Sequence, residues 1–365
     1  MCFRRKLPNV RAVKHISYAT LQKHPLNYLK QRFQSNFNRL LKKTDAPNSS
    51  GTKITVAGCG QVGITICSFL LMRNLAKQLV IYDVRHDWAQ AEALDLLHGS
   101  CFINNPTITA CNDGSKTKDS NIVIVTVGAR PSGKDRSRLA IVQKTADILK
   151  SVMPLLVKQS PNAVFLIISN PADIMTWYVQ KMCKLDKFRC FTTGCHLDSA
   201  RFRYAIAQRM GLPSRSVEGY VIGEHGASAV PVWSTVTVAG VPLMRVVPDI
   251  GGSEDKENWT DLFNKGVTKG AAAVSSVKGY TNWAVALAAV DVVSAILNNS
   301  GRVMSLGTDV CGLNCIEDHV VLSLPCVVKS NGITHILQLP LTDTEQQQLL
   351  KSANMLLEVQ CGLKV

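Results

Sequence analysis

Apolar residues in the region 51–193 form short, nearly continuous runs instead of alternating with polar ones. The runs cover residues 54–56, 79–83, 121–129 and 163–171, and stretches with helical spacing separate them. Strands that are buried on both faces of a parallel sheet have this pattern, because helices cover both faces. The pattern predicts an α/β fold: a Rossmann-type, doubly wound parallel sheet over residues 51–193, followed by an α+β domain over residues 194–365.

The first fifty residues have a different pattern. Apolar side chains recur at steps of three and four over residues 26–40, and residues 1–44 hold eleven Lys and Arg but no acid. Without these eleven charges the formal net charge of +15 falls to +4, so the body does not resemble a nucleic-acid-binding protein. We interpret residues 1–50 as a basic extension. It is either a mitochondrial transit peptide, or an arm that packs on a neighbouring subunit of a cytoplasmic protein.

Cysteine usage and the most apolar segment exclude two further classes. The twelve cysteines are scattered without a Cys-x-x-Cys pair, so we expect reduced thiols and no metal site. The most apolar run, residues 283–297, is shorter than the roughly 18 residues of a membrane span and contains Asp291. No transmembrane segment is expected.

A glycine-rich segment, GCGQVG at residues 58–63, lies between the first predicted strand and the following helix. Asp83 ends the next strand, 20 residues after Gly63, which completes the fingerprint of a dinucleotide site. The helix N-terminus favours phosphate, and the carboxylate of Asp83 favours ribose hydroxyls over a 2′-phosphate. The alternative is a glycine turn without a ligand. We expect NAD, held by Gly58, Gly60, Gln61, Val62, Gly63 and Asp83.

Polar residues that follow the later strands are candidates for chemistry, because ligands of such sheets bind beyond the carboxyl ends of the strands. Arg130 and Asn170 follow two of them, and the segment GCHLDSARFR contains Asp198 and Arg201. Taken alone, these two residues are spaced as an ordinary i,i+3 ion pair on a helix surface. The segment GEHGAS places His225 between an acid and a glycine.

These segments, together with SNPADIMTW, SRLAIVQK and KGYTNWA, resemble the lactate/malate dehydrogenase family, and within it the L-lactate dehydrogenases. The resemblance extends from about residue 53 to 360. It implies an NAD-dependent L-2-hydroxy-acid dehydrogenase, which interconverts L-lactate and pyruvate and assembles as a homotetramer. Two alternatives stay open: a malate or other 2-keto-acid dehydrogenase, and a catalytically weak, structural NAD-binding protein.

The resemblance also implies roles for the matching positions. His225 would donate and accept the proton with Asp198 as its partner, and Arg138 would polarise the substrate carbonyl. Substrate-binding residues would be Arg138, Asn170, Arg201 and Thr281, and Arg130 and Asn170 would contact the cofactor. The residue types suit these roles: histidine titrates near neutral pH, and arginine binds a carboxylate through two parallel hydrogen bonds.

The chain departs from the family pattern after Arg130. The stretch is one residue longer than usual, so Arg136 is an alternative to Arg138. The position that normally distinguishes lactate from malate enzymes is Pro131, or Ser132 if the insertion falls earlier, and neither of the usual side chains is present. Ala227 and His196 stand where the family usually has Asp and Asn.

Overall fold

A computed structural model of the chain describes residues 51–129 and 138–364, which belong to one compact unit. The basic extension, residues 1–50, lies outside the described residues. Arg130, Pro131, Ser132, Gly133 and Arg136 lie outside them as well.

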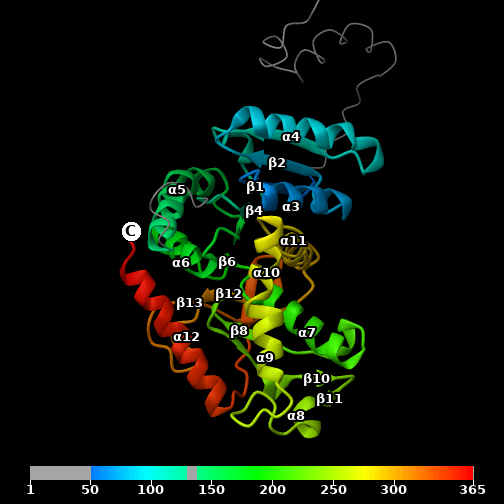
Figure 1. The fold of residues 1–365 in the computed structure, drawn as a ribbon. Coiled ribbons are helices and arrows are strands. Elements are labelled where there is room, and N and C mark those ends of the chain that lie inside the picture. Colours follow the sequence, from blue (N-terminus) through cyan, green and yellow to red (C-terminus); the bar gives the residue numbers. More distant parts are fainter. Residues whose placement is uncertain (1–50, 130–137, 365) are drawn as a thin grey trace, which may run out of the picture. The chain divides into compact units, whose positions relative to one another are not determined.

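Six parallel strands form the first half of this unit, in the order β3-β2-β1-β4-β5-β6. Figure 1 labels β1, β2, β4 and β6 of this series. This order is that of a doubly wound nucleotide-binding sheet, so the predicted fold class is confirmed. Strands β1, β2, β4 and β5 coincide with the four apolar runs. The elements are β1 (Lys53–Ala57), α3 (Gln61–Met72), β2 (Gln78–Tyr82), α4 (His86–His98), β3 (Thr107–Cys111), β4 (Ile122–Val125), α5 (Arg138–Gln159), β5 (Val164–Ile167), α6 (Ala172–Cys183) and β6 (Cys190–Thr192).

Successive residues of the central strands point to opposite, equally buried faces. In β4, Val123 and Val125 pack in a cluster with α5 and α6, whereas Ile122 and Ile124 pack in a cluster with α3. All four side chains are fully buried. Because both faces are covered by helices, both sets of positions favour apolar side chains, which explains the continuous apolar runs.

The same sheet continues into the second half of the unit. Strand β12 pairs antiparallel with β6, and the order continues as β12-β13-β8-β9, with β14 on β13. A separate small sheet has the order β11-β10-β7. The elements are α7 (His196–Met210), β7 (Val217–Glu218), β8 (Val221–Gly223), β9 (Ala229–Pro231), β10 (Thr237–Val238), β11 (Val241–Pro242), α8 (Leu243–Val246), α9 (Trp259–Phe263), α10 (Gly270–Lys278), α11 (Trp283–Leu297), β12 (Arg302–Asp309), β13 (Val321–Lys329), β14 (Gly332–Ile336) and α12 (Asp343–Cys361).

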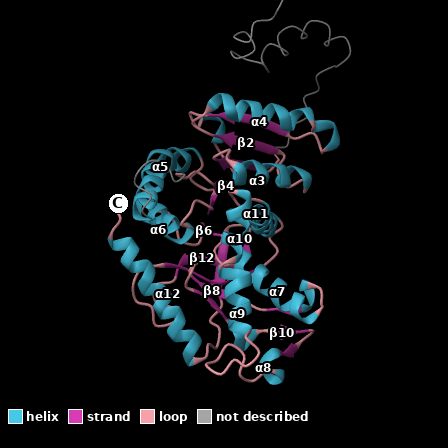
Figure 2. Cartoon of the chain, in the orientation of Figure 1, coloured by secondary structure: helices cyan, strands magenta, loops and turns pink. Residues whose placement is uncertain are grey.

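Helices surround the strands of this long sheet (Figure 2). The apolar run at residues 283–297 forms α11, which packs against α3 and contributes Val290 and Val293 to the cluster on that face. Helix α12 covers the other face together with α5 and α6. Among the described residues, no helix is long and apolar enough to cross a membrane. The boundary predicted between residues 193 and 194 stays a prediction.

Candidate active site

A cleft of about 890 Å³ lies beyond the carboxyl ends of the parallel strands. The residues that line it come from the turn after β1, the end of β2, the end of β4, the segment after β5 and the loop before α11. They include Gly58, Gly60, Gln61, Val62, Gly63, Asp83, Asn170 and Thr281. The predicted cofactor-binding residues that the structure describes therefore line one cleft. Two substrate candidates, Asn170 and Thr281, line the same cleft.

The turn from β1 into α3 depends on glycine for two reasons. Gly58 has a φ of +99°, a left-handed conformation that side chains disfavour, and its carbonyl accepts a hydrogen bond of 2.8 Å from the Thr126 hydroxyl. A Cβ on Gly63 would lie 1.8 Å from the Gly58 carbonyl oxygen. At Gly60, by contrast, a Cβ would meet no atom within 4 Å, because this position faces the cleft. The turn therefore leaves room for a pyrophosphate at the N-terminus of α3, which fits a dinucleotide.

Asp83 is held rigidly at the end of β2. One carboxylate oxygen accepts hydrogen bonds from the Cys59 amide at 2.9 Å and from the Cys59 thiol at 3.2 Å. The other oxygen accepts from the Arg85 amide at 2.9 Å. Burial acts to raise the pKa of Asp83, but these hydrogen bonds outweigh it and keep the carboxyl ionised. The residue that would bind the ribose is thus fixed and negatively charged.

The different surroundings of two glycines give a test of this cleft. Gly60→Ala should fold with an unchanged melting temperature but bind NADH roughly tenfold more weakly or worse, because its methyl group occupies the cleft. Gly63→Ala should lose about 1–3 kcal/mol of stability through overlap with the Gly58 carbonyl. Gly270→Ala, in an open position of α10, is the control. Fluorescence titration with NADH and thermal unfolding measure the two effects. Normal NADH binding by Gly60→Ala would place the pyrophosphate elsewhere.

The second cluster of candidates comes together around His225, which follows β8. Its Nδ1 lies 2.5 Å from Oδ2 of Asp198 in the first turn of α7. Asp198 is 4% exposed, and its other oxygen accepts a hydrogen bond of 3.0 Å from Nη1 of Arg201. One buried carboxylate thus orients both the imidazole and the guanidinium. These three residues are not among those that line the dinucleotide cleft.

Charge within this cluster favours the protonated imidazole. The carboxylate of Asp198 raises the pKa of His225 to about 9, against the effect of burial, which lowers it. Burial acts to raise the pKa of Asp198, but the charges of His225 and Arg201 outweigh it and hold that pKa below its usual value. The site therefore keeps a proton on His225 at neutral pH, ready for donation.

The chain also departs from the family pattern at His196 and Ala227, and the structure shows different surroundings for these two residues. His196, at the start of α7, has its Nε2 3.0 Å from Oδ2 of Asp291 on α11. Arg302 completes this group with bonds of 2.7 and 2.9 Å to the same carboxylate. His196 thus links α7 to α11. Ala227 has no polar side chain and lies beside the turn in which the Ser228 amide donates a hydrogen bond of 3.1 Å to Oε2 of Glu224.

Arg138 is the first residue of α5, and the structure describes its main chain but not its side chain. The choice between Arg138 and Arg136 therefore stays a prediction, as does the role of Arg130.

Sequence reasoning missed two residues that support the site. Asp173 on α6 is 2% exposed and accepts a hydrogen bond of 2.7 Å from the His225 amide. Asn282 donates to the hydroxyl of Thr65 on α3 at 2.9 Å, which fixes the loop that carries Thr281. A signal existed for Asp173: an acid in a helix whose neighbouring residues are apolar. No local sequence signal indicated Asn282, because its partner Thr65 is 217 residues away along the chain.

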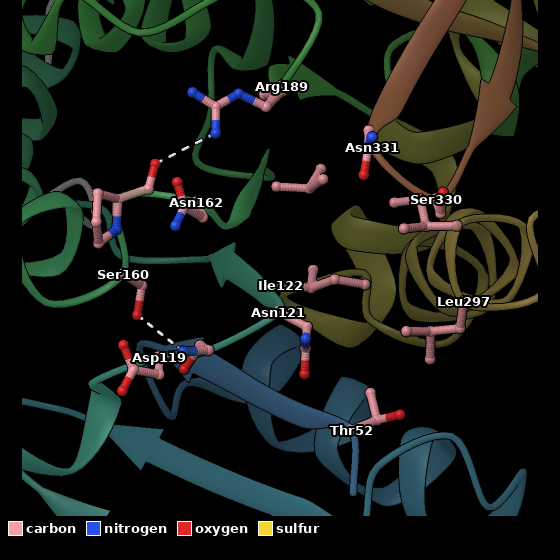
Figure 3. Close-up of a pocket in the computed structure, with 14 residues that line it drawn as sticks. Thr52, Asp119, Asn121, Ile122, Ser160, Asn162, Arg189, Leu297, Ser330 and Asn331 are labelled. Carbon is pink, nitrogen blue, oxygen red and sulfur yellow. Dashed lines mark hydrogen bonds between the residues drawn. The ribbon is translucent and has the colours of Figure 1, made fainter. Parts of the chain in front are cut away.

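A second cleft, of about 650 Å³, lies at the opposite, amino-terminal ends of the strands (Figure 3). Its lining is mixed: it includes the polar residues Thr52, Asp119, Asn121, Asn162 and Arg189 and apolar residues such as Ile122 and Leu297. Polar groups of this lining form hydrogen bonds with neighbouring residues of the chain: Arg189, for example, donates to the Pro161 carbonyl at 3.2 Å. Of the predicted site residues whose side chains the structure describes, none lines this cleft, so we assign the predicted chemistry to the carboxyl ends.

Comparison with known proteins agrees with this geometry. Residues 52–192 match the NAD binding domain of lactate/malate dehydrogenase, and residues 195–363 match its alpha/beta C-terminal domain. The chain is 44% identical to the L-lactate dehydrogenase B chain of Squalus acanthias, over 87% of this chain and 94% of that protein. It is 45% identical to the L-lactate dehydrogenase of Petromyzon marinus, over 87% and 94%. It is 42% identical to the human L-lactate dehydrogenase B chain, over 88% and 95%. The chain therefore belongs to the lactate/malate dehydrogenase family.

Proposed function

We propose that the chain is an NAD-dependent L-lactate dehydrogenase, which converts L-lactate and NAD⁺ to pyruvate, NADH and a proton. The observation that carries this proposal is the His225–Asp198–Arg201 cluster, in which a proton donor and a carboxylate-binding group share one buried anchor. The names of the relatives support lactate as the substrate. This reaction belongs to pyruvate metabolism, at the end of glycolysis.

The residues divide the chemistry between them. When bound, the nicotinamide supplies or accepts the hydride. With Nδ1 bonded to Asp198, His225 presents Nε2 to the substrate, where the imidazolium gives its proton to the carbonyl oxygen of pyruvate. Arg201 binds the substrate carboxylate and thereby orients the keto carbon. Arg138 adds a second positive charge at the carbonyl oxygen, where negative charge develops. Asn170 and Thr281 line the dinucleotide cleft, where both would contact the substrate and Asn170 would also contact the cofactor.

Malate or a bulkier 2-hydroxy acid is the second candidate, because Pro131 replaces the usual discriminating side chain. Without an arginine there, no cation is available at that position for the second carboxylate of oxaloacetate. The test is NADH oxidation by the purified chain with pyruvate, oxaloacetate and a branched 2-keto acid. We expect pyruvate to give the highest kcat/KM. Saturable NADH binding without turnover of any of the three would instead support a structural NAD-binding protein.

The raised pKa of His225 sets the pH dependence. Pyruvate reduction needs the imidazolium, so kcat/KM for pyruvate should be constant below the pKa of about 9 and fall tenfold per pH unit above it. Lactate oxidation needs the neutral imidazole, so its kcat/KM should rise over the same range. Both profiles are measured with saturating cofactor. Profiles that bend together, in the same direction, would exclude a single group that exchanges the proton.

We propose that the chain assembles as a homotetramer. In support, apolar side chains of α10 and α11 are exposed in the single chain, with Val277 91% and Trp283 59% exposed. Sedimentation velocity would overturn the proposal if it gave a monomer at micromolar concentration.

We also propose that residues 1–50 direct the chain to mitochondria, on the basis of their basic, acid-free composition. A fusion of these residues to a fluorescent protein should enter mitochondria. A diffuse cytosolic signal would favour a subunit arm instead.

A further inference from the structure

His225 contacts a second carboxylate besides Asp198. Oδ2 of Asp173 accepts the His225 main-chain N–H at 2.7 Å, from the first turn of α6, whereas Asp198 approaches the ring from α7. The histidine is therefore held at its ring and at its main chain, by carboxylates from two different helices. Asp173 also follows Asn170, which lines the dinucleotide cleft, by only three residues. This short segment ties the position of His225 to the cleft.

The surroundings of Asp173 are unusual for a group with only a structural role. Its side chain is 2% exposed, and Oδ1 has no hydrogen-bond partner among the residues that the structure describes. This oxygen faces Gly307 of β12, where a Cβ would lie only 2.9 Å from it. A neutral amide could accept the same N–H bond. A buried carboxyl with one oxygen unsatisfied is costly, unless its charge interacts with a nearby cation.

We propose that Asp173 is a positioning residue for the proton transfer. Its carboxylate fixes the main chain of His225, and its negative charge stabilises the imidazolium. The proposal rests on the proposed function, because it assigns His225 the proton. Burial acts to raise the pKa of Asp173 and the charge of His225 acts to lower it; burial outweighs the charge, so the pKa is raised to about 7. Asp173 therefore carries its charge most fully when His225 is protonated, so the two groups favour each other's ionised state.

Other charged groups also face Asp173 and His225, and they determine how much the charge of Asp173 contributes to the protonation of His225. Asp198 supports the imidazolium and Arg201 opposes it, both from α7. The remaining titratable neighbours, which bear on Asp173 or on the turn at His225, are Glu224 and the buried thiol of Cys195. Because Asp198 makes the direct ring contact, the contribution of Asp173 should be the smaller of the two.

The test is the pKa of His225 in Asp173→Asn, which keeps an acceptor for the N–H and removes the charge. Diethylpyrocarbonate acylates imidazole only in its neutral form. Mass spectrometry of the His225 peptide therefore gives the extent of modification at each pH. We expect the pKa to fall by about one unit relative to the wild type. The fall of kcat/KM for pyruvate at high pH should move by the same amount, with NADH affinity unchanged. An unchanged pKa in a folded variant would reduce Asp173 to a structural role.

A second variant and a measurement on the wild type test the role of Asp173 independently of the folding of Asp173→Asn. Asp173→Ser removes the charge without burying an amide, so the same pKa fall is expected if Asp173→Asn does not fold. In the wild type itself, half-maximal modification of His225 near or below pH 7 would overturn the proposal without any variant. Asp309→Asn is the matched control: Asp309 is also buried, at 9% exposed, but bonds to Cys311 and His319. Because modification does not need turnover, it reports on Asp173 even if the wild type reduces no keto acid.

Discussion

His225→Ala should reduce kcat for pyruvate reduction by about 10²- to 10⁴-fold, the usual contribution of general acid–base catalysis. Among the described residues of the site, the imidazole alone combines a pKa of about 9 with a second nitrogen directed away from its carboxylate partner, whereas the guanidinium of Arg201 does not release its proton. NADH affinity should change little, because His225 does not line the dinucleotide cleft. Single-turnover kinetics and fluorescence titration with NADH measure the two quantities separately.

The matched control for this variant is His319→Ala. His319 also pairs with a carboxylate, with Nδ1 2.7 Å from Oδ2 of Asp309, but its side chain is 76% exposed. Its removal should leave kcat within about twofold, since exposed ion pairs of this kind contribute little. If His225→Ala lost NADH binding as well as turnover, the histidine would support the cofactor cleft instead of the proton transfer.

Arg201→Leu should lower kcat/KM for pyruvate by about 10²- to 10⁴-fold, because two charge-assisted hydrogen bonds of roughly 1.5–3 kcal/mol each are lost. The guanidinium already donates to Asp198 at 3.0 Å, and its side chain is 20% exposed, so it retains donors for a substrate carboxylate. Its charge acts to lower the pKa of His225. The pH at which pyruvate reduction declines should therefore rise slightly in the variant.

Arg203→Leu, two residues further along α7, is the control for Arg201. Arg203 donates to the Ser199 carbonyl at 3.3 Å and lies 3.7 Å from Glu218, so it is occupied away from Asp198. Its loss should change kcat/KM less than about threefold. Equal losses in both variants would indicate a general effect on α7. An unchanged KM for pyruvate in Arg201→Leu would count against the carboxylate contact.

The first half of the fold could be predicted well, because its signals are local. Continuous apolar runs locate β1, β2, β4 and β5, and the spacing of Gly58, Gly60 and Gly63 locates the turn that approaches a phosphate. The sequence pattern did not reveal that β12 pairs with β6, which makes one sheet of both halves. Strand pairing across more than a hundred residues depends on packing, and no local pattern encodes it.

The candidate site divides in the same way. The sequence by itself determined which chemical groups are available: an imidazole, a carboxylate and a guanidinium in motifs of one family. Only the tertiary structure decided that Asp198 serves both His225 and Arg201, and that Asp173 contacts the main chain of His225 from α6. The physical reason is distance along the chain. Residue types and short spacings are local properties, whereas the charge felt by a buried imidazole depends on which helices pack around it.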